Sequence, residues 1–184
     1  ELIVNKKKVV LEQETGYPWN GDIRVKVAQG NQEFALKLRI PGWVRDEVLP
    51  SDLYSYADNQ KPTYRIIVNG QETANTLNNG YLSIERKWKK GDVVKIHFDM
   101  LPRIVKAVDD KGRVSVERGP IVYCAEWPDN KCNVHTVLLN QHPQFKVVEK
   151  PELLYGISQL KTDAQALSYD KNGKLITKDT ELTL

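Results

Sequence analysis

The feature that most constrains this chain is the alternation of apolar and charged residues with a period of two. It is clearest in residues 22–27, 34–40 and 94–100, where every second side chain is apolar and those between are mostly charged or polar. A period of two places all the apolar side chains on one face of a strand. These segments therefore predict half-buried strands of antiparallel sheets that cover a core on one side only.

Turn signals separate the strands at short spacing. Asn-Gly occurs at 20–21, 69–70, 79–80 and 172–173, and the last should close a hairpin between residues 167–169 and 175–177. Asn and Gly suit tight hairpin turns because both tolerate a positive φ. Further strands are predicted at 9–14, 64–68, 81–86, 113–117, 121–125, 137–139 and 145–148.

Helical periodicity is confined to residues 151–160, where a short run of apolar residues contains Gly156. The sequence therefore predicts an all-β fold of two consecutive antiparallel β-sandwich modules, jelly-roll-like, with at most one short helix. Loop-like composition marks 46–62 as an insertion between strands and recurs at 128–133. A change of character near Leu101-Pro102 places the boundary there, with a first module at 16–101 and a second at 102–184.

Charge and hydropathy exclude two classes of partner. The net charge is +3, from 27 basic and 24 acidic residues spread along the chain, so we expect no nucleic-acid partner. No stretch approaches the roughly 20 apolar residues that span a bilayer, so we expect no membrane partner. The chain lacks an initiator methionine, Met100 being its one methionine, as expected of a segment excised from a longer protein. Its compartment stays open between cytoplasmic, periplasmic and secreted.

A metal site is the first chemistry to weigh. Cys124, Glu126, Asp129, Cys132 and His135 lie within a dozen residues, and thiolates with imidazole can bind zinc. Their spacing fits no standard zinc knuckle. Cys124 also lies in an apolar strand, which favours a buried core cysteine. A single bridge between Cys124 and Cys132 is possible in a hairpin, but we expect two free thiols, no metal and no cofactor.

A pair of carboxyls acting as acid and base is the second chemistry to weigh. Glu117 with Glu126, or Asp109 with Asp110, could be proposed as the two carboxyls of a glycosidase. With 24 acidic residues, accidental pairs are common, and Asp109-Asp110-Lys111-Gly112 is typical of a hairpin turn. No nucleophile elbow or phosphate-binding glycine loop is present. We therefore expect no catalytic residue in this chain.

Tryptophans are the third. Trp19, Trp43, Trp88 and Trp127 all lie near turns, where packing at sheet corners explains them. The alternative is a platform that stacks on sugar rings, for which the candidate carbohydrate contacts are Trp43, Trp88 and Trp127.

Six segments, in order, resemble a known family. They are Gly-Tyr-Pro-Trp-Asn-Gly at 16–21, Leu-Arg-Ile-Pro-Gly-Trp at 38–43, Val-Asn-Gly at 68–70, Gly-Tyr-Leu-Ser-Ile at 80–84, Arg-Lys-Trp-Lys-Lys-Gly-Asp at 86–92 and Glu-Arg-Gly-Pro-Ile-Val-Tyr-Cys-Ala-Glu at 117–126. Together they resemble the C-terminal β-sandwich region of bacterial β-L-arabinofuranosidase-type glycoside hydrolases, family 127.

The resemblance implies a helical-barrel catalytic domain upstream, with a zinc-associated cysteine nucleophile and a glutamate acid/base. None of that motif matches a position here, and Cys124 is not that nucleophile. The resemblance also implies that strand 1–15 completes the second module. It makes this chain a non-catalytic accessory region; the alternative is a carbohydrate-binding module. The implied partners are its own upstream catalytic domain, a second copy in a homodimer, and a plant-type or bacterial carbohydrate.

Overall fold

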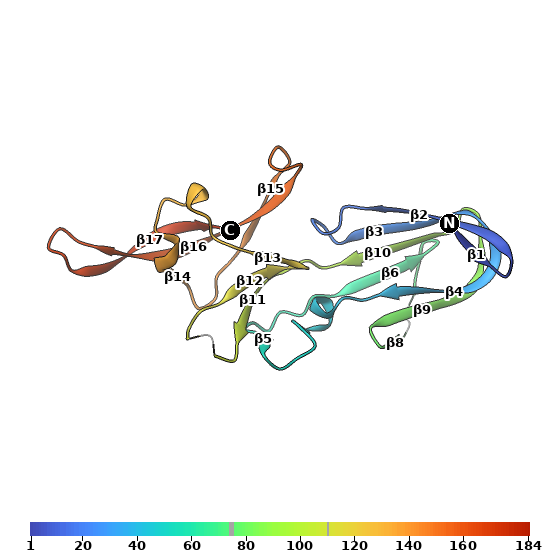
Figure 1. Ribbon diagram of the computed structural model, residues 1–184, viewed down its shortest axis with the longest axis horizontal. Coiled ribbons are helices and arrows are strands. Elements are labelled where there is room, and N and C mark those ends of the chain that lie inside the picture. The colour runs from blue at the N-terminus through green and yellow to red at the C-terminus, as the bar shows by residue number, and fades with distance from the viewer. Residues whose placement is uncertain (74–75, 110) are drawn as a thin grey trace. The chain divides into compact units, whose positions relative to one another are not determined.

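The computed structural model describes residues 1–73, 76–109 and 111–184, and its regular elements are strands and three short 3-10 helices (Figure 1). The all-β prediction is confirmed. Across the described residues, no helix is long and apolar enough to cross a membrane. Contacts divide the chain into unit 1, Glu1–Val114 with Arg118–Ile121, and unit 2, Ser115–Glu117 with Val122–Leu184.

Unit 1 is a sandwich of two antiparallel sheets and contains the 3-10 helix η1 (Gly42–Arg45). The first sheet has the order β1-β2-β3-β10-β6-β7, and the second has the order β4-β9-β8. The strands of the first sheet are β1 (Leu2–Val4), β2 (Lys7–Thr15), β3 (Asp22–Gln29), β10 (Val93–Phe98), β6 (Tyr64–Val68) and β7 (Gln71–Glu72). Those of the second are β4 (Asn31–Arg39), β9 (Tyr81–Lys89) and β8 (Leu77–Asn78).

The core of unit 1 forms where the inner faces of these two sheets meet. β4 and β9 pair in continuous register from Asn31↔Lys89 to Arg39↔Tyr81, so the apolar residues of both strands face the same way. The buried cluster comprises Val27, Leu38, Ile40, Val44, Ile66, Val68, Leu82, Ile84, Trp88, Val94, Ile96 and Phe98. The period-two segments at 22–27, 34–40 and 94–100 thus lie in the core as predicted.

Strand 1–15 was expected to complete the second module. In the structure β2 pairs antiparallel with β3, from Leu11↔Val27 to Thr15↔Ile23, and residues 1–15 belong to unit 1. Val9 of β2 is fully buried, so this strand contributes to the interior of unit 1.

Unit 2 is built around the long strand β16 (Ile157–Tyr169). β17 (Leu175–Thr183) pairs with residues 161–169 of β16 and forms with it the hairpin predicted from Asn172-Gly173. β15 (Lys146–Lys150) pairs with residues 157–161, and β14 (Val137–Leu139) pairs with residues 164–166. The 3-10 helices η2 (Trp127–Asp129) and η3 (Val134–Thr136) also lie in this unit, whereas β12 (Ser115–Arg118) and β13 (Ile121–Tyr123) are divided between the units.

Two segments differ from the prediction. Residues 151–160, for which the sequence allowed at most one short helix, form none: residues 151–156 turn, with Leu154 and Tyr155 at positive φ, and β16 begins at Ile157. Left-handed residues cannot continue a right-handed helix, and Gly156 adds a third. The second segment is a strand that the sequence did not predict, β11 (Pro102–Ala107), which begins at the proposed boundary near Leu101-Pro102. It pairs with β5 (Tyr54–Tyr56) inside the insertion 46–62.

Candidate functional site

Two of the three candidate carbohydrate contacts belong to the interior of unit 1. Trp88 is 1% exposed, and its Nε1 donates a hydrogen bond to the carbonyl of Phe34 at 3.0 Å. Trp43 is half-buried and packs edge-to-face on Phe98, with ring centroids 5.8 Å apart. A ring must expose a face to stack on a sugar, which the burial of Trp88 prevents.

Trp127 is the candidate that presents a face to solvent. It opens the 3-10 helix η2, is 55% exposed and packs edge-to-face on His135, with centroids 5.8 Å apart. Asn130 anchors this helix, because its amide donates to the carbonyls of Glu126 (2.8 Å) and Thr183 (2.9 Å) and accepts from the Thr183 N–H (2.9 Å). Trp127 is therefore a single exposed ring on a helix that Asn130 holds in place.

Cys124 does not lie in the core, where the sequence predicted it. Cys124 follows the end of β13 and is exposed, so its assignment as a buried core cysteine is wrong. The strand ends at Tyr123, and the thiol lies 3.8 Å from Glu126 Oε1. Cys124 and Cys132 are both free thiols, as expected. Within the ranges that the structure describes, no group of three or more His, Cys, Asp or Glu side chains could hold a metal ion.

The carboxylates proposed from the sequence lie at different depths. Glu117 is half-buried on β12, Glu126 is exposed, and Asp109 is exposed beside Asp110, which lies outside the described residues. Burial raises the pKa of a carboxyl that acts as a general acid. Glu126 and Asp109 are exposed, so they lack this burial.

A carboxylate network joins the ends of strands in unit 1. Donation from the Thr63 hydroxyl lowers the pKa of Asp99 below its ordinary value despite partial burial, and the Thr63 N–H (3.2 Å) and His97 add to the effect. His97 lies between two carboxylates, with Nδ1 2.7 Å from Asp22 Oδ1 and Nε2 3.3 Å from Asp99 Oδ1. The network holds Asp99 ionised, which suits a structural clasp and not a proton donor.

A second network ties two turns together through Asp92. Burial raises its pKa, but donation from the Lys89 N–H (2.8 Å) and the Asn69 amide (2.8 Å), with the charge of Arg86, outweighs burial and lowers the pKa overall. Asn69 also accepts from the Val93 N–H at 2.8 Å. The Asn-Gly turn and the Trp-Lys-Lys-Gly-Asp motif therefore serve to join β6, β9 and β10.

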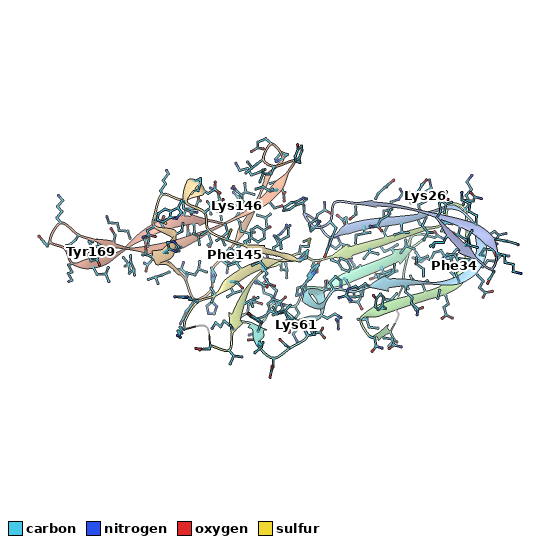
Figure 2. The ribbon with its side chains drawn as sticks, in the orientation of Figure 1. Lys26, Phe34, Lys61, Phe145, Lys146 and Tyr169 are labelled. Carbon is cyan, nitrogen blue, oxygen red and sulfur yellow. The ribbon has the colours of Figure 1, made fainter. Side chains whose placement is uncertain are left out.

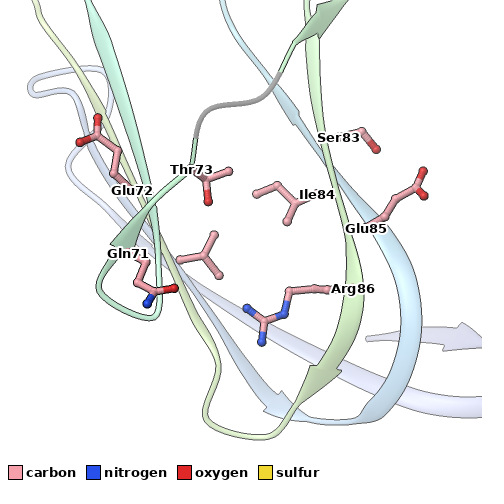
Figure 3. Close-up of a pocket in the computed structure, with 8 residues that line it drawn as sticks. Gln71, Glu72, Thr73, Ser83, Ile84, Glu85 and Arg86 are labelled. Carbon is pink, nitrogen blue, oxygen red and sulfur yellow. The ribbon is translucent and has the colours of Figure 1, made fainter.

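Unit 1 also contains a shallow cavity of about 290 Å³ between the β6–β7 hairpin and β9 (Figure 3). It is lined by Val68, Gln71, Glu72, Thr73, Ser83, Ile84, Glu85 and Arg86. Arg86 already lies 3.7 Å from Asp92 and has its guanidinium carbon 5.1 Å from the Trp88 ring centroid. The cavity thus mixes charges of both signs around an arginine that is engaged in the fold.

Each unit also has large apolar side chains that are exposed. In unit 1, Leu53 and Val108 are exposed beside each other, since the Val108 N–H donates to the Leu53 carbonyl at 3.0 Å. In unit 2, Leu154 and Tyr155 are exposed in the turn before β16, and Tyr169 is exposed near the turn between β16 and β17 (Figure 2). Singly exposed apolar side chains are normal on a protein surface, and only contiguous patches larger than a few hundred Å² mark contacts with other proteins or domains.

Comparison with known families identifies both parts of the chain. A family model described as "Beta-L-arabinofuranosidase, GH127 middle domain" matches residues 1–100. A second, described as "Glycoside hydrolase family 127 C-terminal domain", matches residues 101–172.

Three individual relatives are named as β-arabinofuranosidases. A solved GH127 β-arabinofuranosidase is 74% identical, with a TM-score of 0.97 over 99% of this chain and 29% of its own. A GH127 β-L-arabinofuranosidase from Geobacillus stearothermophilus T6 is 28% identical, with a TM-score of 0.79 over 99% of this chain and 28% of its own. A non-reducing end β-L-arabinofuranosidase from Bifidobacterium longum subsp. longum is 30% identical over 66% of this chain and 17% of its own length. The chain thus spans under a third of each.

Proposed function

Because this chain belongs to glycoside hydrolase family 127, we propose that it is the non-catalytic β-sandwich region of a longer β-L-arabinofuranosidase-type enzyme. Its role is to support or flank a helical-barrel catalytic domain that lies outside these 184 residues. The observation that carries the proposal is the extent of the match, which covers 99% of this chain but 29% of the solved relative.

The geometry supports a scaffolding role. The polar networks around Asp92 and Asp99 connect strands and turns within unit 1, and both carboxyls have lowered pKa values. Glycoside hydrolysis needs one carboxyl with a raised pKa facing a second across the scissile bond. Asp92 and Asp99 instead stabilise the sandwich.

An assay of glycoside hydrolysis tests whether this chain is non-catalytic. The full-length parent protein should hydrolyse an aryl β-L-arabinofuranoside, and the 184-residue chain alone should not. A matched pair of preparations from the same host controls for contaminating hydrolase. Turnover by the purified chain that persists in independent preparations would refute the proposal.

The same proposal includes the domain division. A first module at 16–101 and a second at 102–184 is supported by the junction of the two family models between residues 100 and 101. β11 pairs with β5 and so belongs to unit 1.

A second candidate function is carbohydrate binding through Trp127, which its exposure favours. One stacked ring contributes modest affinity, so binding would be weak. Titration of the 184-residue chain with arabinan-type oligosaccharides should then give a signal that Trp127→Ala abolishes and Trp19→Ala, the matched exposed control, retains. An unchanged titration for Trp127→Ala would remove this candidate.

A further inference from the structure

A second cavity of unit 1, of about 460 Å³, lies on the outer face of its first sheet. Strand β10 lies between β3 and β6 in this sheet, and the turn at Asn69-Gly70 follows β6 (Figure 1). The described residues that line the cavity come from these three strands and this turn, and they are Arg24, Ile67, Asn69, Gly70, Val93 and Lys95. Two of the six are cationic and none is acidic. The volume lies within the range of small-molecule sites.

The two cations oppose each other directly in the sheet. Lys95 of β10 pairs with Arg24 of β3 in the strand register. Val94 and Ile96 are buried in the core, so Lys95 between them faces outward, on the same side as Arg24. Like charges directly opposite each other destabilise a sheet. Arg24 offsets part of this cost, because its Nη1 donates to Glu14 Oε2 at 2.8 Å.

Lys95 has no such compensation. Within the ranges that the structure describes, its ammonium makes no ion pair. Its cross-strand neighbour on β6 is Ile67, and the next side chains on its own face of β10 are Val93 and His97. The ring nitrogens of His97 already contact two carboxylates. Glu72 opposes Ile67 one strand further away and does not line the cavity. The cavity therefore has an unneutralised positive charge.

The cavity also has the donors and the apolar surface that a ligand needs. A guanidinium carries five N–H donors, and the Arg24 hydrogen bond to Glu14 uses one nitrogen. An arginine and a lysine that line one cavity can bind a single carboxylate through charge-assisted hydrogen bonds. Ile67 and Val93 are half-buried and give the same cavity an apolar part. Apolar contact with a few placed polar groups is the usual composition of a small-molecule site.

From this arrangement we infer that the cavity binds an acidic saccharide, a sugar ring that bears a carboxylate. Lys95 and Arg24 bind the carboxylate, while Ile67 and Val93 pack against the C–H face of the ring. The bound carboxylate neutralises the repulsion between the two opposed cations, a local conflict of the kind that proteins retain at functional sites. The choice of a saccharide rests on the proposed function, because a glycoside hydrolase works among saccharides; the choice of an anion rests on the cavity alone.

Amide NMR titration of the 184-residue chain with digalacturonate tests the inference. Digalacturonate carries a carboxylate on each ring, and the neutral disaccharide of galactose with the same linkage is its matched control. We expect digalacturonate to shift the amide signals of Gly70, Val93 and Lys95 saturably, and the neutral disaccharide to leave them in place. Because the cations are exposed to solvent, added salt should weaken the binding.

Two variants separate the cavity from the general charge of the sheet. Lys95→Gln keeps most of the side chain and removes its charge, so it should raise the dissociation constant about tenfold. Lys26→Gln is the matched variant, because Lys26 lies on the same strand as Arg24, 3.8 Å from Glu12, and does not line the cavity. It should change the dissociation constant less than about twofold. Since Lys95 faces a like charge, Lys95→Gln should keep or raise the urea midpoint, which separates lost binding from lost folding.

The inference would be overturned by the absence of a saturable shift with digalacturonate, by equal binding of the neutral disaccharide, or by an equal loss of affinity in Lys26→Gln. Inorganic phosphate that binds as tightly as digalacturonate would refute the saccharide assignment. A lowered urea midpoint for Lys95→Gln would contradict the unneutralised charge. A failed titration with an inactive isolated chain and an active full-length enzyme would remove this inference alone, whereas hydrolysis by the isolated chain would remove the proposed function whatever the titration gives.

Discussion

Trp88 offers the sharpest test of how unit 1 is built, because its ring was a candidate for sugar contact and lies in the core. Trp88→Ala removes a side chain that is 1% exposed and packs with the Phe34 ring at a centroid distance of 6.0 Å. Truncation of a buried tryptophan costs about 3–5 kcal/mol of unfolding free energy. The lost hydrogen bond from Nε1 to the Phe34 carbonyl accounts for about 1 kcal/mol of that figure.

Trp127→Ala is the matched control. Its ring is 55% exposed and has one aromatic neighbour, His135, so its loss should cost about 1 kcal/mol or less. Trp88→Phe should fall between the two, since it keeps a ring and loses the indole donor.

The measurement is urea unfolding of the chain followed by far-UV circular dichroism, which remains comparable when a tryptophan is removed. Because contacts divide the chain into two units, we expect separate unfolding transitions, and the transition that Trp88→Ala shifts should be the one that Trp127→Ala leaves in place. A cost for Trp88→Ala below about 1 kcal/mol, or equal to that of Trp127→Ala, would show that the ring is not packed as described.

Three further predictions follow from unit 1. The folded pKa of Asp99 is below its ordinary value of 3.8, so its ionised form stabilises the fold above that pH. This contribution is lost as the pH falls through the lowered pKa. Thr63→Val should weaken this acid dependence of the urea midpoint, and an unchanged pH profile would contradict the prediction. Asn69→Ala should cost about 1–2 kcal/mol, because it removes two side-chain hydrogen bonds between turns, whereas Asn172→Ala, in an exposed hairpin turn, should cost less in the same assay. Gly21→Ala should cost about 3 kcal/mol or prevent folding, because a Cβ at Gly21 would lie 1.9 Å from the backbone oxygen of Phe98; a normal thermal midpoint would disprove that close approach.

Local periodicity accounts for the success of the strand predictions. Residues 22–27, 34–40 and 94–100 each carry enough alternation to specify both a strand and its buried face, and Asn172-Gly173 specified a hairpin. The missed strand β11 begins with Pro102 and contains the buried Arg103, so neither its first residue nor its charge resembles a core strand. Its partner β5 has three residues, too few for a periodic signal.

Burial of single side chains was harder to predict because it depends on partners distant in sequence. Cys124 looked like a core residue from its apolar neighbours, yet β13 ends before it and leaves it exposed. Trp88 and Trp127 both adjoin turns in the sequence. One is covered by the opposing sheet of the sandwich, and the other opens a 3-10 helix on the surface.

The sequence by itself therefore determined the fold class, most strands, the turns between them and the family, because each is encoded in short runs of residues whose pattern follows backbone geometry. The tertiary structure alone decided which tryptophans face solvent, which carboxylates are bound by distant donors, and how the buried Arg103 pairs with Asp46 and Asp58 of an insertion distant from it in sequence. Those outcomes depend on which strands become neighbours, and strand pairing is set by the packing of the whole sandwich.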